Sequence, residues 1–279
     1  MSNDTRRLTE NCSLFAAYSS PQGRVLALMH LLPHSSGVAA ILPRELVLPT
    51  LEALRRFVLR AKVKIEDAGE SLSVAGLHDA GRPRSEGYTE TDGIGVAGVN
   101  RDPGRCWVIG AAEKLAEHRL DGDVLRADQF ESYWRLADIR AGLPQIYLST
   151  REAFVAQMLN LDLLDGISFS KGCYTGQEII ARTQHLGRIK RRLYRLQLPV
   201  GDWRIGQPLH LSDGRSGRLV EVIRSGGGFE ALAVLNVDAG AAESAADAPT
   251  TGNAPITADA PNAADAPVKA ARLPLPYEL

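Results

Sequence analysis

The densest cluster of residues that could do chemistry is the segment GISFSKGCYTGQE, residues 166–178. Cys173 follows Lys171 by two residues and comes just before a predicted helix. The partial positive charge of a helix N-terminus and a nearby ammonium group both favour a thiolate. This spacing indicates a reactive or ligand-binding thiol in a loop of small residues. An inert cysteine in a packing turn stays open as the alternative, because unpaired cysteines are commonly buried.

The helix after the thiol is predicted from its flanking residues. Thr175 can cap it, with Glu178 three residues later in the spacing of a capping box. Gly172 and Gly176 permit tight turns or a close approach of two backbones. Gly187 is placed to end the helix.

A second candidate is Trp134, in the segment YWRLADIRAGLP, residues 133–144. Such an aromatic residue is typical of a core or a domain interface. It can also serve as a stacking platform for a planar heterocycle. Composition alone favours the first interpretation and leaves the second open.

A basic stretch follows the predicted helix and consists of Arg188, Lys190, Arg191, Arg192 and Arg195. It could contact phosphate or RNA. We favour a solvated face at the start of a strand, since no aromatic pattern of an RNA-binding motif accompanies it. His185, near the end of the helix, could act as a base, but a structural role is the more common one for a lone histidine.

Hydrophobic patterning predicts the elements that must position these groups. Apolar runs over residues 13–19 and 24–32 flank Ser20–Gly23 and predict a hairpin. A third strand over 38–42, a helix over 45–60 and a strand at Val63–Ile65 complete an α+β layer. Further strands are predicted over 71–77, 94–99 and 107–110, and helices over 111–118 and 128–140, the latter closed by Gly142 and Pro144. From residue 193 onward, short runs over 194–199, 208–211, 216–223 and 231–237 predict a small barrel.

Charge is unevenly distributed along the 279 residues, which have 32 Lys and Arg against 33 Asp and Glu. Residues 239–267 are rich in Ala and Pro and hold four acidic residues but no Lys or Arg. The other 250 residues therefore carry 32 basic against 29 acidic side chains, a net charge of +3. We expect a flexible acidic insert in a slightly basic body. The near-neutral balance argues against a dedicated nucleic-acid coat, and no apolar run is long enough to span a membrane.

The octapeptide KGCYTGQE resembles the K-G-C-Y-x-G-Q-E signature of the YgfZ-type folate-binding proteins, relatives of the glycine-cleavage aminomethyltransferase. Every fixed position is matched, by Lys171, Gly172, Cys173, Tyr174, Gly176, Gln177 and Glu178. Other segments are also similar to the family: SPQGRVLA (20–27), FVLRAKVKIED (57–67), WRLADIRAGLPQI (134–146) and LPLPYEL (273–279). The resemblance covers essentially the whole chain.

The resemblance implies an α+β fold with two ferredoxin-like α+β domains and a C-terminal antiparallel β-barrel around a central folate cavity. The corresponding domains are residues 1–75, 76–190 and 191–279, with the insert 239–267 inside the barrel. Relatives begin with a further segment that contains a second folate-contacting tryptophan. We therefore expect the first domain to be incomplete at its N-terminus.

The resemblance also implies a function, that of a folate-binding accessory protein for the assembly or repair of iron–sulfur enzymes, including one that thiomethylates tRNA. By position, Trp134 matches a folate-contacting tryptophan, and Cys173 matches the cysteine on which function depends. The implied cofactor is tetrahydrofolate or a one-carbon derivative, and the implied partners are iron–sulfur client enzymes. We expect a cytoplasmic monomer without membrane contact, direct nucleic-acid binding or a resident metal. The folate pocket would place a one-carbon group near Cys173, with Lys171 keeping the thiol partly ionised.

Two alternatives remain from other functional classes. One is a tetrahydrofolate-dependent aminomethyltransferase, although the signature loop is of the YgfZ type and no dense set of acids and bases surrounds it. The other is an RNA-binding module that uses residues 188–195. Whether the protein turns over a substrate stays open, and we lean toward a protein that is not an enzyme.

Overall fold

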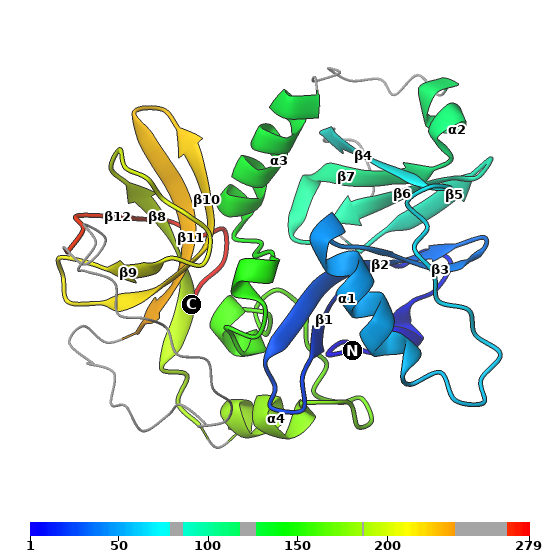
Figure 1. Ribbon diagram of the computed structural model, residues 1–279, viewed down its shortest axis with the longest axis horizontal. Helices are drawn as coiled ribbons and strands as arrows, with labels where there is room; N and C mark the ends of the chain where they lie inside the picture. Colours follow the sequence, from blue (N-terminus) through cyan, green and yellow to red (C-terminus); the bar gives the residue numbers. More distant parts are fainter. Residues whose placement is uncertain (79–85, 118–126, 186, 238–266) are drawn as a thin grey trace.

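The computed structural model describes residues 1–78, 86–117, 127–185, 187–237 and 267–279, without the side chains of 127–129. These residues form three antiparallel sheets. The long helix α3 (Ala127–Ala141) stands between the sheet of the C-terminal third and the two sheets that precede it (Figure 1). Three 3-10 turns connect the elements, at Thr5–Arg7, Leu148–Thr150 and Ala156–Leu159.

The first sheet has the order β1-β2-β3 and confirms the predicted hairpin and third strand. Its strands are β1 (Leu14–Ser19), β2 (Val25–His34) and β3 (Gly37–Ile41), followed by α1 (Arg44–Arg55). All six residues of β1 are buried. Successive residues of the strand point to opposite faces of the sheet, and both faces are covered. Leu14 packs in the cluster that contains Leu54 of α1. Phe15 packs on the other face in the central core, the cluster that also contains Trp134 and Leu232.

Two expectations for the segment after α1 are wrong. The helix predicted over 45–60 ends at Arg55, and the strand predicted at Val63–Ile65 is absent, since residues 56–66 form no strand. A strand needs a neighbour for its backbone hydrogen bonds, and the first sheet extends no further than β3. The Arg55 side chain instead donates two hydrogen bonds to the Ile65 carbonyl oxygen, and Val63 is exposed.

The second sheet has the order β4-β7-β6-β5. Its strands are β4 (Ser73–His78), β5 (Tyr88–Thr91), β6 (Ile94–Val99) and β7 (Asp102–Gly110), and α2 (Ala112–Glu117) follows. Strand β5 is not predicted from its sequence, because three of its four residues are polar. Antiparallel pairing with β6 holds it in the sheet.

The third sheet has the order β12-β8-β11-β10-β9. Its strands are β8 (Arg191–Leu198), β9 (Pro208–His210), β10 (Ser216–Ser225), β11 (Gly228–Asn236) and β12 (Ala271–Leu273). Within the described residues the sheet is open, so the predicted barrel is not confirmed. The segment of residues 268–273 meets both ends of this sheet. Val268 exchanges backbone hydrogen bonds with His210 and Ser212, beside the edge strand β9. A few residues later, β12 pairs with β8 at the other end. Except for Pro267, the insert 239–267 lies outside the described residues.

Ion pairs fasten α3 to the third sheet. Arg135 donates to Glu221 of β10 at 2.5 Å, and Arg140 donates to Glu230 of β11 at 2.8 Å. Both carboxylates are buried, so each cation is matched to an acceptor that water does not reach. At the end of α3, Gly142 has a φ of +68° and its carbonyl accepts a hydrogen bond from the Tyr277 hydroxyl at 2.9 Å. Gly142 thus ends the helix as predicted, whereas the division of the chain into three domains stays a prediction.

Candidate functional site

The signature loop leads into helix α4 (Gln177–His185), which lies below the tip of the β1–β2 hairpin (Figure 1). The Gln177 side-chain oxygen accepts a hydrogen bond from the Tyr174 backbone N–H at 3.2 Å. The capping contact in the structure therefore joins Tyr174 and Gln177, one residue earlier than the predicted pair Thr175 and Glu178. The last helical residue is His185, which is the end expected when Gly187 is the C′ residue.

Gly176 brings the loop into backbone contact with the hairpin turn. It has a φ of +83°, and a Cβ at this position would lie 2.6 Å from the Ser20 carbonyl oxygen. The predicted close approach of two backbones is therefore found at Gly176. Around Gly172, by contrast, no atom lies within 4 Å of the place where a Cβ would stand.

Lys171 holds the loop against the first residues of the described chain. Its Nζ donates to the carbonyl oxygens of Met1 and Asn3, both at 2.9 Å, and lies 4.9 Å from the centroid of the Tyr174 ring. Burial lowers the pKa of the Lys171 ammonium. Cys173 is exposed. Since the described contacts of Lys171 are made with these other groups, the expected effect of Lys171 on the thiol stays a prediction.

Tyr174 and Glu178 differ in their exposure to solvent. The Tyr174 ring packs against the central core, and burial raises the pKa of its hydroxyl to about 12. Glu178 is exposed in the first turn of α4. The signature residues therefore divide into those that anchor the loop (Lys171, Tyr174, Gly176 and Gln177) and those that face solvent (Gly172, Cys173 and Glu178).

Trp134 is 5% exposed and belongs to the central core. Its ring centroid lies 4.4 Å from that of Trp107 and 5.4 Å from that of Phe130. The guanidinium carbon of Arg105 lies 4.5 Å from the same centroid. This packing favours the interpretation as a core aromatic, and a pterin ring could stack directly on Trp134 only after one of these groups moves.

Arg105 links Trp134 to the surface of the molecule. Its side chain is 1% exposed, and it lies 2.6 Å from Asp102 and 2.8 Å from Asp138. It also donates to the Trp134 carbonyl oxygen at 3.3 Å. Burial raises the pKa of Asp138 to about 6, against the opposing charge of Arg105. A buried cation between two carboxylates fixes the orientation of both.

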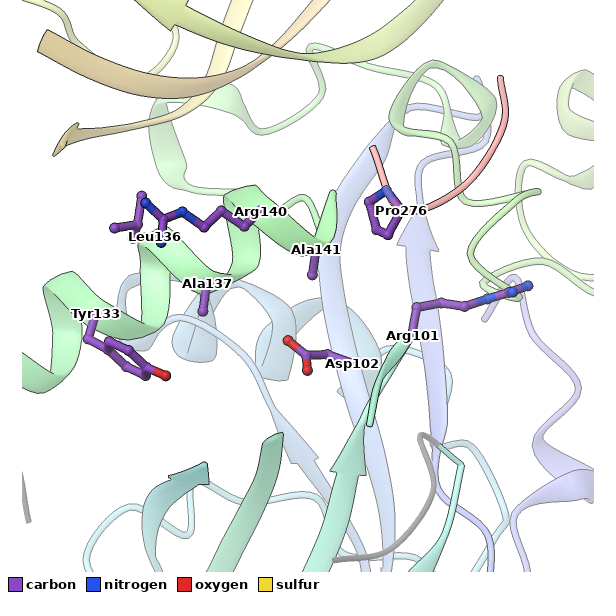
Figure 2. Close-up of a pocket in the computed structure, with 8 residues that line it drawn as sticks. All are labelled: Arg101, Asp102, Tyr133, Leu136, Ala137, Arg140, Ala141 and Pro276. Carbon is purple, nitrogen blue, oxygen red and sulfur yellow. The ribbon is translucent and has the colours of Figure 1, made fainter. Parts of the chain in front are cut away.

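A cavity of about 360 Å³ lies between α3 and the start of β7 (Figure 2). Its polar lining comes from Arg101, Asp102, Tyr133 and Arg140. Figure 2 shows the Asp102 carboxylate lying below Ala137 of α3, while Arg101 and Arg140 extend in opposite directions. The volume lies in the range of small-molecule sites, which is roughly 300–1,000 Å³. The cavity thus offers one carboxylate acceptor, Asp102, with Arg101 and Arg140 at its border.

Arg101, Asp102 and Arg140 were not among the predicted site residues, although Arg140 lies in the segment 133–144 that contains Trp134. Arg101 comes from the turn between β6 and β7, Asp102 begins β7, and Arg140 comes from α3, so only the fold brings them together. No residue of 171–178 is among the described residues that line it. The expected neighbourhood of the folate pocket and Cys173 therefore stays a prediction.

Two arginines of the basic stretch, Arg192 and Arg195, form ion pairs inside the protein. Arg192 makes two hydrogen bonds to the Asp162 carboxylate, at 2.6 and 2.9 Å. Arg195 lies 2.6 Å from Glu230. Arg192 and Arg195, two of the five basic residues predicted as an alternative RNA contact, are therefore engaged within the protein. The His185 ring stacks edge-on against Phe169, with centroids 6.1 Å apart.

Within the described part of the chain, no three His, Cys, Asp or Glu side chains gather in a way that could hold a metal ion. Among the same residues, no helix is both long and apolar enough to cross a membrane.

The chain is similar in sequence to bacterial proteins named tRNA-modifying protein YgfZ. It is 30% identical over 206 residues to the tRNA-modifying protein YgfZ of Hamiltonella defensa, covering 68% of this chain and 60% of that protein. It is 29% identical over 249 residues to YgfZ of Photobacterium profundum, covering 78% and 74%. YgfZ of Colwellia psychrerythraea is 29% identical over 202 residues, covering 68% of this chain and 62% of that protein. The match to the Hamiltonella and Colwellia proteins thus spans about 60% of the length of each.

Among solved structures, the glycine cleavage system aminomethyltransferase T of Bartonella henselae aligns with a TM-score of 0.48 at 13% identity, covering 82% of this chain and 69% of that one. No protein-family model matches the sequence. On the sequence comparisons, the chain is a homologue of the YgfZ proteins.

Proposed function

We propose that the protein binds a reduced folate in the cavity beside α3 and supports tRNA modification through an iron–sulfur enzyme. The observation that carries the folate assignment is the set of polar groups in this cavity. Asp102 is an acceptor for the N–H groups of a pterin ring, and Tyr133 offers a flat surface. Arg101 and Arg140 are cations suited to the carboxylates of the glutamate tail. The donor set therefore fits a folate.

These groups are held in place by neighbours outside the cavity. Arg101 lies 2.6 Å from Asp165, Asp102 is 2.6 Å from the buried Arg105, and Arg140 is 2.8 Å from Glu230. Preorganised side chains lose less conformational entropy when a ligand binds. In this arrangement Trp134 supports the site from behind, through its contact with Arg105.

The exposed thiol of Cys173 is the second part of the proposal. Cys173 lies on the outside of a loop that four anchoring residues fix in place. An exposed thiol on a fixed loop is accessible to a partner protein, whereas a buried one is not. We propose that Cys173 acts on the iron–sulfur client rather than on the core of this protein. The relatives named tRNA-modifying protein support the choice of tRNA modification.

Titration with 5-formyltetrahydrofolate, followed by calorimetry, tests the folate site. Each of Asp102→Asn and Arg140→Gln should weaken binding about tenfold or more, because each removes a charge-assisted hydrogen bond. Arg56→Gln, an exposed arginine just after α1, is the matched control and should bind like the parent. Equal affinity in all four proteins would remove the cavity from the proposal.

Two further variants separate the roles of Trp134 and Cys173. If the pterin stacks directly on Trp134, folate should quench tryptophan fluorescence in the parent and not in Trp134→Phe. If the cavity alone binds folate, the parent protein and Trp134→Phe should bind folate with similar affinity.

Cys173→Ala in a deletion strain should lose the thiomethylated tRNA while the purified variant still binds folate. Full restoration of the modified tRNA would exclude Cys173 from the function.

A further inference from the structure

A second cavity lies on the third sheet and shares no lining residue with the one beside α3. It has a volume of about 310 Å³. Three of its lining residues are basic, namely Arg191 of β8, His210 of β9 and Arg218 of β10. Phe154 and Val234 contribute buried apolar surface. None of the described residues that line it is an Asp or Glu.

The strand register explains why these side chains meet. Arg218 is paired with Pro208 on one side and with Val234 on the other. His210 is paired with Ser216, and Arg191 with Asn236. Directly paired residues, and residues two apart in one strand, point to the same face of a sheet. The cations of β8, β9 and β10 therefore lie on one face of the third sheet.

Neighbouring groups orient the two guanidinium groups. Arg218 donates to the Gly206 carbonyl oxygen at 2.6 Å. The Arg191 Nε donates to the Asn236 side-chain oxygen at 3.0 Å, and Asn236 in turn donates to the Ser216 hydroxyl at 3.3 Å. Arginine stays charged at every physiological pH, and its planar fork matches the oxygens of a phosphate group. This arrangement places two oriented cations beside an apolar wall, which suits an anion with an apolar part.

We propose that this cavity binds a nucleoside phosphate, with the phosphate group between Arg191 and Arg218 and the nucleoside against the apolar wall. The ligand is either a free nucleotide or the 5′-terminal nucleotide of an RNA strand, which present the same chemistry. The choice of RNA as a source rests on the proposed role in tRNA modification, but the phosphate site does not.

The experiment uses the full chain and two labelled probes. One probe is fluorescent AMP, and the other is a short single-stranded RNA with a 5′ phosphate and a 3′ fluorophore. Adenosine and the same RNA without its 5′ phosphate serve as ligand controls. Arg218→Gln should weaken binding of a phosphorylated probe about tenfold or more, because it removes a charged phosphate contact. His210→Glu should weaken it similarly, since it adds a carboxylate without removing a side-chain hydrogen bond that the structure describes.

The matched control is Arg224→Gln, which removes the same charge from an exposed position on the same strand, β10. It should bind within about twofold of the parent, since a distant surface charge is largely screened. Binding of AMP alone would identify a free nucleotide as the ligand, and binding of the RNA alone would identify RNA. Binding of neither probe, equal binding of the dephosphorylated controls, or equal loss in Arg218→Gln and Arg224→Gln would overturn the proposal. Titration of the same variants with 5-formyltetrahydrofolate keeps this outcome separate from the folate proposal.

Discussion

Gly23 and Gly176 touch backbone to backbone, although 152 residues lie between them in the chain. A Cβ on Gly176 would lie 3.0 Å from the Gly23 Cα, and a Cβ on Gly23 would lie 2.9 Å from the Ile179 Cβ. Both glycines have positive φ, +72° and +83°. The tip of the first hairpin thus positions the start of α4, and with it the loop that carries Cys173.

This contact predicts that Gly176→Ala destabilises the protein. The added methyl group would meet the Ser20 carbonyl oxygen at 2.6 Å, and the positive φ is unfavourable for alanine. We expect a loss of about 2 kcal/mol or more in the free energy of unfolding, measured with urea. Gly172→Ala, four residues earlier in an open position, should change stability by less than about 0.5 kcal/mol. Equal stability of the two variants would contradict the contact.

The sequence pattern predicts those elements whose burial follows from their own apolar runs. Leu14 to Ser19 and Val25 to His34 are long runs joined by a turn, so the hairpin follows from local chemistry alone. The polar β5 and the irregular residues 56–66 were missed because pairing with a neighbouring strand decides their state. The same holds for function. A contiguous motif reveals Cys173, whereas the cavity around Asp102 exists only after α3 has docked beside the turn between β6 and β7.

Glu230 predicts an acid-sensitive contribution to stability. Burial opposes its ionisation, but hydrogen bonds from Arg140, Arg195 and Ser225 outweigh this effect and lower its pKa to about 2 from 4.5. Because the folded-state pKa is depressed, the stabilisation is present above the unfolded-state pKa. It is lost as the pH falls from 4.5 toward 2. The shift corresponds to about 3 kcal/mol at neutral pH.

Urea unfolding from neutral pH down to about pH 3 measures this contribution. Glu230→Gln should be less stable than the parent at neutral pH and should lose less stability on acidification. Glu113→Gln, an exposed position on α2, should keep the acid dependence of the parent. If Glu230→Gln lost stability on acidification as steeply as the parent, the ion pairs would not be responsible.

The tight packing of Trp134 against β4 gives a further prediction. A Cβ on Gly76 would overlap the Trp134 Cζ3 and lie 2.5 Å from the Phe130 Cζ, so Gly76→Ala must displace the aromatic cluster. We expect a loss of about 2 kcal/mol or more in unfolding free energy, as for other overpacked cores. A changed near-ultraviolet circular dichroism spectrum should accompany it. Gly104→Ala on β7, whose nearest neighbour would be His78 at 3.4 Å, is the control and should keep the parent spectrum.

The three cysteines should differ sharply in reactivity toward a thiol reagent such as Ellman's. Cys173 is exposed, Cys12 is partly buried and Cys106 is fully buried. Burial also raises the pKa of the Cys12 thiol, which reduces its thiolate fraction at neutral pH. One thiol should therefore react in a fast phase in the native protein, and Cys106 should react only when the protein unfolds. Cys173→Ser should abolish the fast phase, whereas Cys12→Ser should leave it intact. A fast phase that persists in Cys173→Ser would contradict the exposed position of the signature loop.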